Sequence, residues 1–128
     1  MRGPDADTLL FFNEHLKALP IYDRLEETLY SRFPVVNKRV QKTQISFSNR
    51  RLFACVSFAR VKRKAELPDP YLVLTLGLSY PLESRRVAVQ SEPYPGRWTI
   101  HIVLGSIDEI DDELLAWLRQ AYDFAASK

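Results

Sequence analysis

The side chains that most often carry chemistry are scarce in this sequence and lie far apart. His15, His101 and Cys55 are its imidazole and thiol groups, and no two of them have the spacing of a zinc site. Cys55 lies in an apolar stretch, where burial raises the pKa of a thiol and makes it unreactive. Four glycines cannot build a phosphate-binding loop or a dinucleotide fingerprint. The sequence therefore predicts neither a metal site nor a cofactor.

His101 is the more informative of the two histidines. The alternation of its strand places it on the face opposite to Trp98 and Ile100. If helices cover the Trp98 side, His101 lies on the open face, where it could meet Lys42, Thr99 or an arginine. An imidazole there can titrate near neutral pH. The alternative is a surface histidine that is hydrogen-bonded across strands and has no functional role.

The middle of the chain is basic, although the net charge of the whole sequence is only +2. Residues 37–100 contain 12 Lys and Arg side chains against four Asp and Glu, whereas both ends of the chain are acidic. One hypothesis is a nucleic-acid-binding sheet face or rim that contacts phosphates and stacks bases on aromatic rings. Its basic candidates are Lys38, Arg39, Lys42, Arg50, Arg51, residues 60–64 and Arg97, and its aromatic candidates are Phe47, Phe53, Tyr94 and Trp98. The alternative is that Lys and Arg protect strand edges against aggregation, since no recognised nucleic-acid motif is present.

Two helices are predicted before the basic segment and one after it. Apolar residues at helical spacing predict helices over residues 8–19 and 20–33, separated at Pro20 and closed by Pro34. Together they should form an αα hairpin. A Ser106 and Glu109 pair matches a capping box, so a C-terminal helix is expected to begin there and to continue to about residue 125.

Strands are predicted between these helices. Alternation or a continuous apolar run marks residues 43–48, 52–61, 71–80 and 97–104, with a further short strand at 86–90. Consecutive strands on short turns favour an antiparallel meander. We therefore expect one α+β domain over residues 1–128, in which an antiparallel sheet of four to five strands carries all helices on one face.

Cysteine content and hydropathy bear on where the protein works. A single cysteine excludes an intramolecular disulfide and is typical of a reducing compartment. No segment resembles a secretory signal, and the longest apolar stretch, residues 71–78, is far short of the ~20 residues that span a bilayer. We expect a cytoplasmic protein without membrane association. The oligomeric state does not follow from the sequence.

Five short motifs resemble those of an uncharacterised bacterial family, a domain of unknown function. They are Lys-Thr-Gln-Ile-Ser-Phe at 42–47, Arg-Leu-Phe-Ala at 51–54, Leu-Glu-Ser-Arg-Arg-Val at 82–87, Trp-Thr-Ile-His at 98–101 and Trp-Leu-Arg-Gln-Ala-Tyr at 117–122. The family pattern has Glu-Ser-Pro-Arg and Trp-Leu-Arg-Glu-Ala-Tyr, so the chain departs from it at Arg85 and Gln120. The family has no established activity. The resemblance does imply a set of candidate ligand-binding residues: Lys42, Thr43, Arg86, Trp98 and His101.

Two functional hypotheses follow. The first is a non-enzymatic binding module whose basic sheet face recognises an anionic ligand, which would be nucleic acid, a phosphorylated metabolite or an acidic protein surface. The second is an uncharacterised enzyme in which His101 acts as general acid or base while Lys42 or Arg86 stabilises negative charge. The first is preferred because no nucleophile or second acid–base group can be named. Either hypothesis predicts that Lys42, Arg86 and His101 converge on the open side of the sheet.

Overall fold

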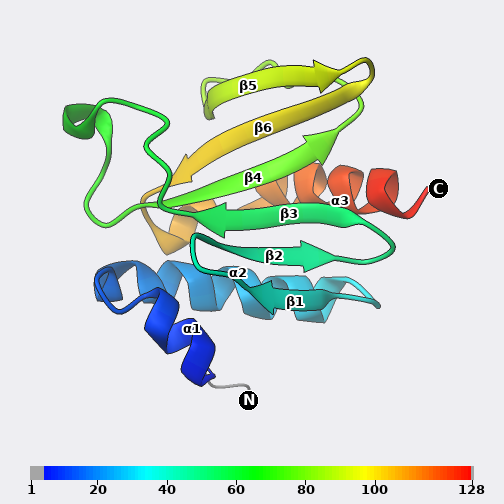
Figure 1. Cartoon of the computed structure of the whole chain (residues 1–128). Helices are drawn as coiled ribbons and strands as arrows, with labels where there is room; N and C mark the ends of the chain where they lie inside the picture. Colours follow the sequence, from blue (N-terminus) through cyan, green and yellow to red (C-terminus); the bar gives the residue numbers. More distant parts are fainter. Residues whose placement is uncertain (1–4, 128) are drawn as a thin grey trace.

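A six-stranded antiparallel sheet forms the centre of the structure, a computed structural model that describes residues 5–127. Its strands are β1 (Asn37–Val40), β2 (Gln44–Ser48), β3 (Leu52–Ser57), β4 (Leu72–Leu78), β5 (Val87–Tyr94) and β6 (Arg97–Leu104). They lie side by side in the order β1-β2-β3-β4-β6-β5 (Figure 1). The structure thus confirms the α+β class and the antiparallel sheet.

Helices α2 (Leu19–Arg32) and α3 (Asp112–Ala126) pack on the same face of this sheet, whereas α1 (Ala6–Phe11) lies beside β1 (Figure 1). Three short 3-10 helices complete the described elements: η1 (Leu16–Ala18), η2 (Lys64–Glu66) and η3 (Ile107–Glu109). In the part of the chain that the structure describes, no helix combines the length and the apolar character needed to cross a membrane.

The core lies between the sheet and the two long helices. Alternate residues of β4 and β6 point into it, among them Leu74, Leu76 and Ile100, each at most 1% exposed. Leu114 and Leu118 of α3 meet them from the other side and are fully buried. Strand positions of the other parity form what we call the open face, which no helix covers: Arg39, Gln44, Ser46, Cys55, Ser57, Val73, Thr75, Gly77, Thr99, His101 and Val103.

The expected number of strands is wrong by one or two, because β1 was not foreseen. Its sequence, Asn-Lys-Arg-Val, has no apolar alternation. The strand forms because a short turn brings it against β2, where Lys38 lies opposite Phe47 and Val40 opposite Ile45. Backbone pairing with a neighbour, rather than a pattern of its own, makes this segment a strand.

The predicted αα hairpin is also corrected. Helix α1 ends at Phe11, well before the expected end at residue 19, and the chain enters α2 through η1. Of the apolar residues beyond the end of α1 that suggested a longer helix, Phe12 is buried but Leu16 is 60% exposed. A helical spacing without a surface to cover on that side does not produce a helix.

The strand order differs from a meander at one point. Strand β6 lies between β4 and β5, so β5 becomes the edge strand. The connection from β4 to β5, residues 79–86, carries Leu82, which is 8% exposed and belongs to the core cluster. Burial of this side chain holds the connection on the helical side of the sheet, which decides where the next residues lie.

Candidate functional site

Arg86, just before β5, forms its hydrogen bonds and ion pairs with residues at the start of α3. Its Nη1 donates to Asp111 Oδ1 at 2.9 Å and to Glu113 Oε1 at 3.1 Å, and its Nη2 donates to the carbonyl oxygen of Glu109 at 2.5 Å. The guanidinium also lies 5.6 Å from the centroid of the Trp117 ring. Arg86 therefore ties the edge strand to α3, and the expectation that it reaches the open side of the sheet is wrong.

The same contacts stabilise the N-terminus of α3. Asp111 is the N-cap residue, and its Oδ1 accepts the backbone N–H of Leu114 at 3.0 Å. This backbone hydrogen bond, followed by the hydrogen bond from Arg86, holds the pKa of Asp111 below its ordinary value. The predicted capping pair, Ser106 and Glu109, is found one element earlier, at η3.

His101 lies on the open face, as the alternation of its strand predicts. It pairs with Thr75 across β4 and β6, and its Nδ1 is 2.8 Å from Thr75 Oγ1. Burial lowers the pKa of His101 below its ordinary value of 6.5, because the charged imidazolium is less well solvated there. Within residues 5–127 it forms no ion pair with a carboxylate.

Trp98 belongs to the opposite side of the sheet. It lies opposite Leu78 in the β4–β6 pair and packs half-buried against the core. Phe47 and Phe53, two other candidates for base stacking, are at most 1% exposed. Phe47 and Phe53 stabilise the core and cannot stack on bases, so that detail of the nucleic-acid hypothesis is wrong for these two rings. Tyr94 differs, because 68% of it is exposed.

Lys42 and Thr43 line a cavity of about 610 Å³ at one end of the sheet. Three chain segments form its wall: the end of α1 with its connection to η1, the turn between β1 and β2 with the first residue of β2, and residues 57–59 at the end of β3. The ring of His15 stacks on that of Phe58, with centroids 3.8 Å apart and planes 15° from parallel. A second cavity of about 370 Å³ adjoins the first, since Asn13, Glu14 and His15 line both.

A buried polar cluster was not foreseen from the sequence. Lys38 Nζ lies 2.7 Å from Glu26 Oε2, 2.5 Å from Thr8 Oγ1 and 3.3 Å from Asp5 Oδ2. Tyr22 donates its hydroxyl hydrogen to Glu26 Oε2 at 2.5 Å. The sequence held one signal: Glu26 follows Tyr22 by four residues, on the buried face of α2, and a buried carboxylate requires a cation. Lys38 is thus removed from the basic sheet face that the sequence suggested.

Comparison with known protein families shows a match over most of the chain. Residues 10–125 match the family described as domain of unknown function DUF5655. The chain belongs to this family. Comparisons with curated proteins and with solved structures gave no match. The resemblance found in the sequence motifs is thereby confirmed, and family membership adds no activity.

The candidate residues of this family member lie in three separate places. Lys42 and Thr43 line the cavity, His101 lies on the open face, and Arg86 and Trp98 face the helical side. The structure does not bring Lys42, Arg86 and His101 together. Among the described residues, no group of three His, Cys, Asp or Glu side chains is arranged to hold a metal ion.

Most cations of the basic segment have no ionic partner. In residues 5–127, ten of its Lys and Arg side chains form no ion pair. They are Arg39, Lys42, Arg50, Arg51, Arg60, Lys62, Arg63, Lys64, Arg85 and Arg97. Lys38 and Arg86, in contrast, are paired with carboxylates and are 10% and 20% exposed at their side chains. The positive charge that remains available lies at the margins of the open face.

Proposed function

We propose that this domain is a non-enzymatic binding module for a polyanion, and that the polyanion is nucleic acid. The observation that supports the proposal is the set of unpaired cations at the margins of a sheet face that no helix covers and whose central strand positions carry no charge. Polar strand positions of the open face, among them Ser46, Thr75 and His101, are uncharged, and the apolar Val73 and Val103 lie next to them. Hydroxyl, amide and imidazole groups of this kind can hydrogen-bond to sugars and base edges, while surrounding cations neutralise phosphates.

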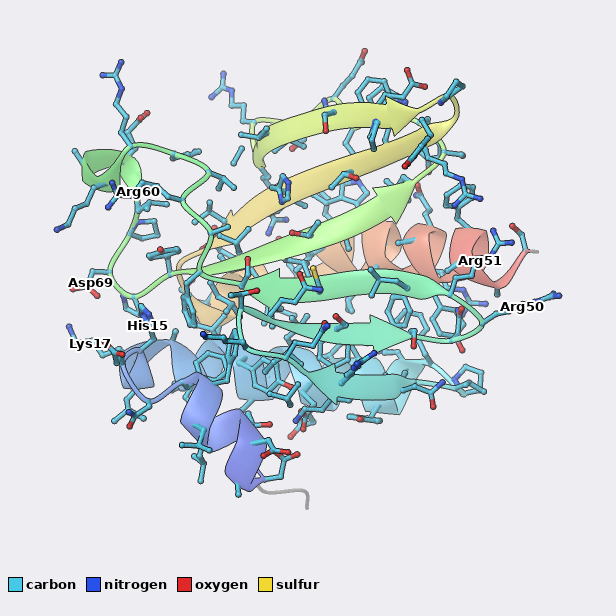
Figure 2. All side chains as sticks on the ribbon, viewed as in Figure 1. His15, Lys17, Arg50, Arg51, Arg60 and Asp69 are labelled. Atoms are coloured by element: carbon cyan, nitrogen blue, oxygen red, sulfur yellow. The ribbon has the colours of Figure 1, made fainter. Side chains whose placement is uncertain are left out.

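Two groups of cations lie at opposite ends of the sheet. The turn group, Arg50 and Arg51, lies between β2 and β3, and the loop group, Arg60, Lys62, Arg63 and Lys64, follows β3. Figure 2 shows Arg50 and Arg51 at one end and Arg60 at the other. Strand β3 has six residues, so the two ends are about 20 Å apart at ~3.3 Å per residue.

This separation supports nucleic acid over the other two anionic ligands that the sequence left open. A distance of about 20 Å is more than twice the ~8 Å screening length at physiological ionic strength, so a phosphorylated metabolite would contact only one group. A polymer can contact both. Nucleic acid is favoured over an acidic protein because four of the six cations are arginines, whose planar forks match phosphate oxygens, and because the neutral polar surface lies between them.

No observation favours the enzymatic alternative. It would require His101 to act on a substrate held by Lys42 or Arg86. Arg86 lies on the other side of the sheet, and Lys42 lies at the cavity beside the β1–β2 turn. His101 is hydrogen-bonded to Thr75 instead.

Fluorescence anisotropy with labelled RNA and DNA oligonucleotides of about 12 nucleotides, single- and double-stranded, tests the proposal. Replacing two cations by glutamine in either group (Arg60→Gln with Arg63→Gln, or Arg50→Gln with Arg51→Gln) should weaken binding. It should also reduce the slope of log K against log salt by about 1.4 for a single strand, at ~0.7 per lost phosphate contact.

The matched control is Arg24→Gln with Arg32→Gln. These two arginines are exposed on α2, on the helical side, and form no ion pair within the described residues. This pair should leave affinity and salt slope unchanged. An equal loss in the control would show that net charge rather than the sheet margin is responsible. Binding of polyglutamate without binding of any oligonucleotide would identify an acidic protein surface and overturn the choice of nucleic acid.

A further inference from the structure

The cavity beside the β1–β2 turn has one wall made of aromatic rings. Phe58 is at its centre: Phe11 stacks on it at 5.6 Å with an angle of 25°, and His15 stacks at 3.8 Å. Tyr71 contacts the Phe58 ring edge-on at 5.9 Å and donates a hydrogen bond from its hydroxyl to the Phe58 carbonyl at 3.0 Å. Phe58 follows the end of β3, so these contacts fix a loop residue in one position.

Leu10 adds to this apolar wall and is the most exposed large hydrophobic residue of the described chain, at 72%. Rings held by their neighbours lose little entropy when a ligand binds, which is what a preformed site requires. The cavity volume, about 610 Å³, is within the ~300–1,000 Å³ range of small-molecule sites. An apolar ligand body would therefore find a rigid surface here.

Two opposite charges face the same cavity. Lys42 comes from the β1–β2 turn and Glu14 from the connection between α1 and η1. They do not pair with each other, and within residues 5–127 neither forms an ion pair with another side chain. Lys42 alone would favour an anionic ligand. Glu14 repels such a ligand unless the ligand also carries a positively charged group. A ligand that carries both charges satisfies both side chains.

We propose that this cavity binds a zwitterionic ligand of the amino-acid type with an apolar side chain. Lys42 contacts the carboxylate, Glu14 contacts the ammonium group, and the side chain of the ligand packs on Leu10 and Phe58. Thr43 and Ser57 supply hydroxyl groups at the same wall. The site differs from the cation groups proposed for nucleic acid, because its recognition depends on a carboxylate of the protein as well as on a lysine.

The test uses phenylalanine and two analogues that each lack one charge: N-acetylphenylalanine has no ammonium group, and phenethylamine has no carboxylate. Titrations are followed by amide chemical shifts in a two-dimensional NMR spectrum, and shifts are expected at residues 10–15, 42–44 and 57–59. Phenylalanine should bind more tightly than either analogue, by about two- to fivefold for each exposed ion pair that is lost.

Charge variants assign each contact. Lys42→Gln should weaken phenylalanine and N-acetylphenylalanine but leave phenethylamine unchanged, and Glu14→Gln should weaken phenylalanine and phenethylamine but leave N-acetylphenylalanine unchanged. The matched controls, Arg24→Gln and Glu27→Gln, remove one positive and one negative charge on α2, away from the cavity. Absence of shifts at the cavity residues with phenylalanine, or equal affinity for phenylalanine and N-acetylphenylalanine, would overturn the proposal. Neither result bears on oligonucleotide binding, which is measured separately.

Discussion

Replacing Lys38 by methionine is expected to destabilise the fold strongly, although Lys38 is only one of twelve Lys and Arg side chains in the basic segment. The side chains of Lys38 and Glu26 are only 10% and 9% exposed, and their charged atoms are 2.7 Å apart. Methionine keeps the length of the side chain but leaves the Glu26 carboxylate buried without its cation. Breaking a buried ion pair in this way costs about 3–5 kcal/mol.

The lower end of that range applies here, because Tyr22 still donates its hydroxyl hydrogen to Glu26 after the substitution. A loss of about 3 kcal/mol in the free energy of unfolding corresponds to a clear thermal shift. The unfolding entropy of a chain of 128 residues is ~0.27 kcal/mol/K at ~2.1 cal/mol/K per residue. The melting temperature of Lys38→Met should therefore fall by about 11 °C.

Urea denaturation and thermal melts followed by circular dichroism give both quantities. Arg39→Met is the matched control, because Arg39 is the next residue of β1, is exposed, and forms no ion pair in the described chain. Its effect should stay within about 0.5 kcal/mol. The double variant Lys38→Met with Glu26→Gln should lose less than the sum of the two single losses, because both single variants remove the same interaction.

A loss below about 1 kcal/mol for Lys38→Met would refute this reasoning, since that value is typical of an exposed pair. Strict additivity in the double variant would refute it as well. Either outcome would mean that water reaches Lys38 and that the cluster does not hold α1 and α2 against β1. Lys38 would then return to the set of available cations.

Three further predictions follow from the site geometry. In urea denaturation, Arg86→Met should lower the free energy of unfolding by about 1–2 kcal/mol, because Arg86 contacts the start of α3. The neighbouring Arg85→Met should lower it by less than about 0.5 kcal/mol, and equal losses would contradict this assignment. Because the pKa of His101 is lowered in the folded state, the unfolded chain takes up a proton at higher pH than the folded chain. The free energy of unfolding should therefore decrease as the pH drops below about 6.5. In urea melts at several pH values, this decrease should be smaller in a His101→Gln variant than in the control variant His15→Gln. The pKa of the Cys55 thiol is raised by burial, so a disulfide reagent at neutral pH should label the native protein much more slowly than the urea-unfolded chain; rapid native labelling would be inconsistent with the buried position.

Local patterns in the sequence determined the class of the fold and the inner face of each central strand. Leu72, Leu74, Leu76 and Leu78 alternate with smaller or polar residues, and all four are at most 1% exposed. The same rule placed His101 on the open face. Such predictions succeed because a strand has a side-chain period of two and one face must be buried, so the information lies within a few adjacent residues. The motifs at 42–47, 51–54, 82–87, 98–101 and 117–122 likewise indicated the family.

Tertiary structure alone decided which charged groups remain available for binding. Lys38 and Lys42 are four residues apart, yet Lys38 is paired with the buried Glu26 and is 10% exposed at its side chain, whereas Lys42 lines an open cavity. Arg86 follows Leu82, whose burial holds the chain on the helical side and delivers the guanidinium to α3. Pairing of charges depends on residues distant in sequence, 12 positions for Lys38 with Glu26 and 25 for Arg86 with Asp111. Charged groups interact strongly only when they are a few ångströms apart in space. Which of them pair is therefore set by the packing of strands and helices and cannot be predicted from their positions along the chain.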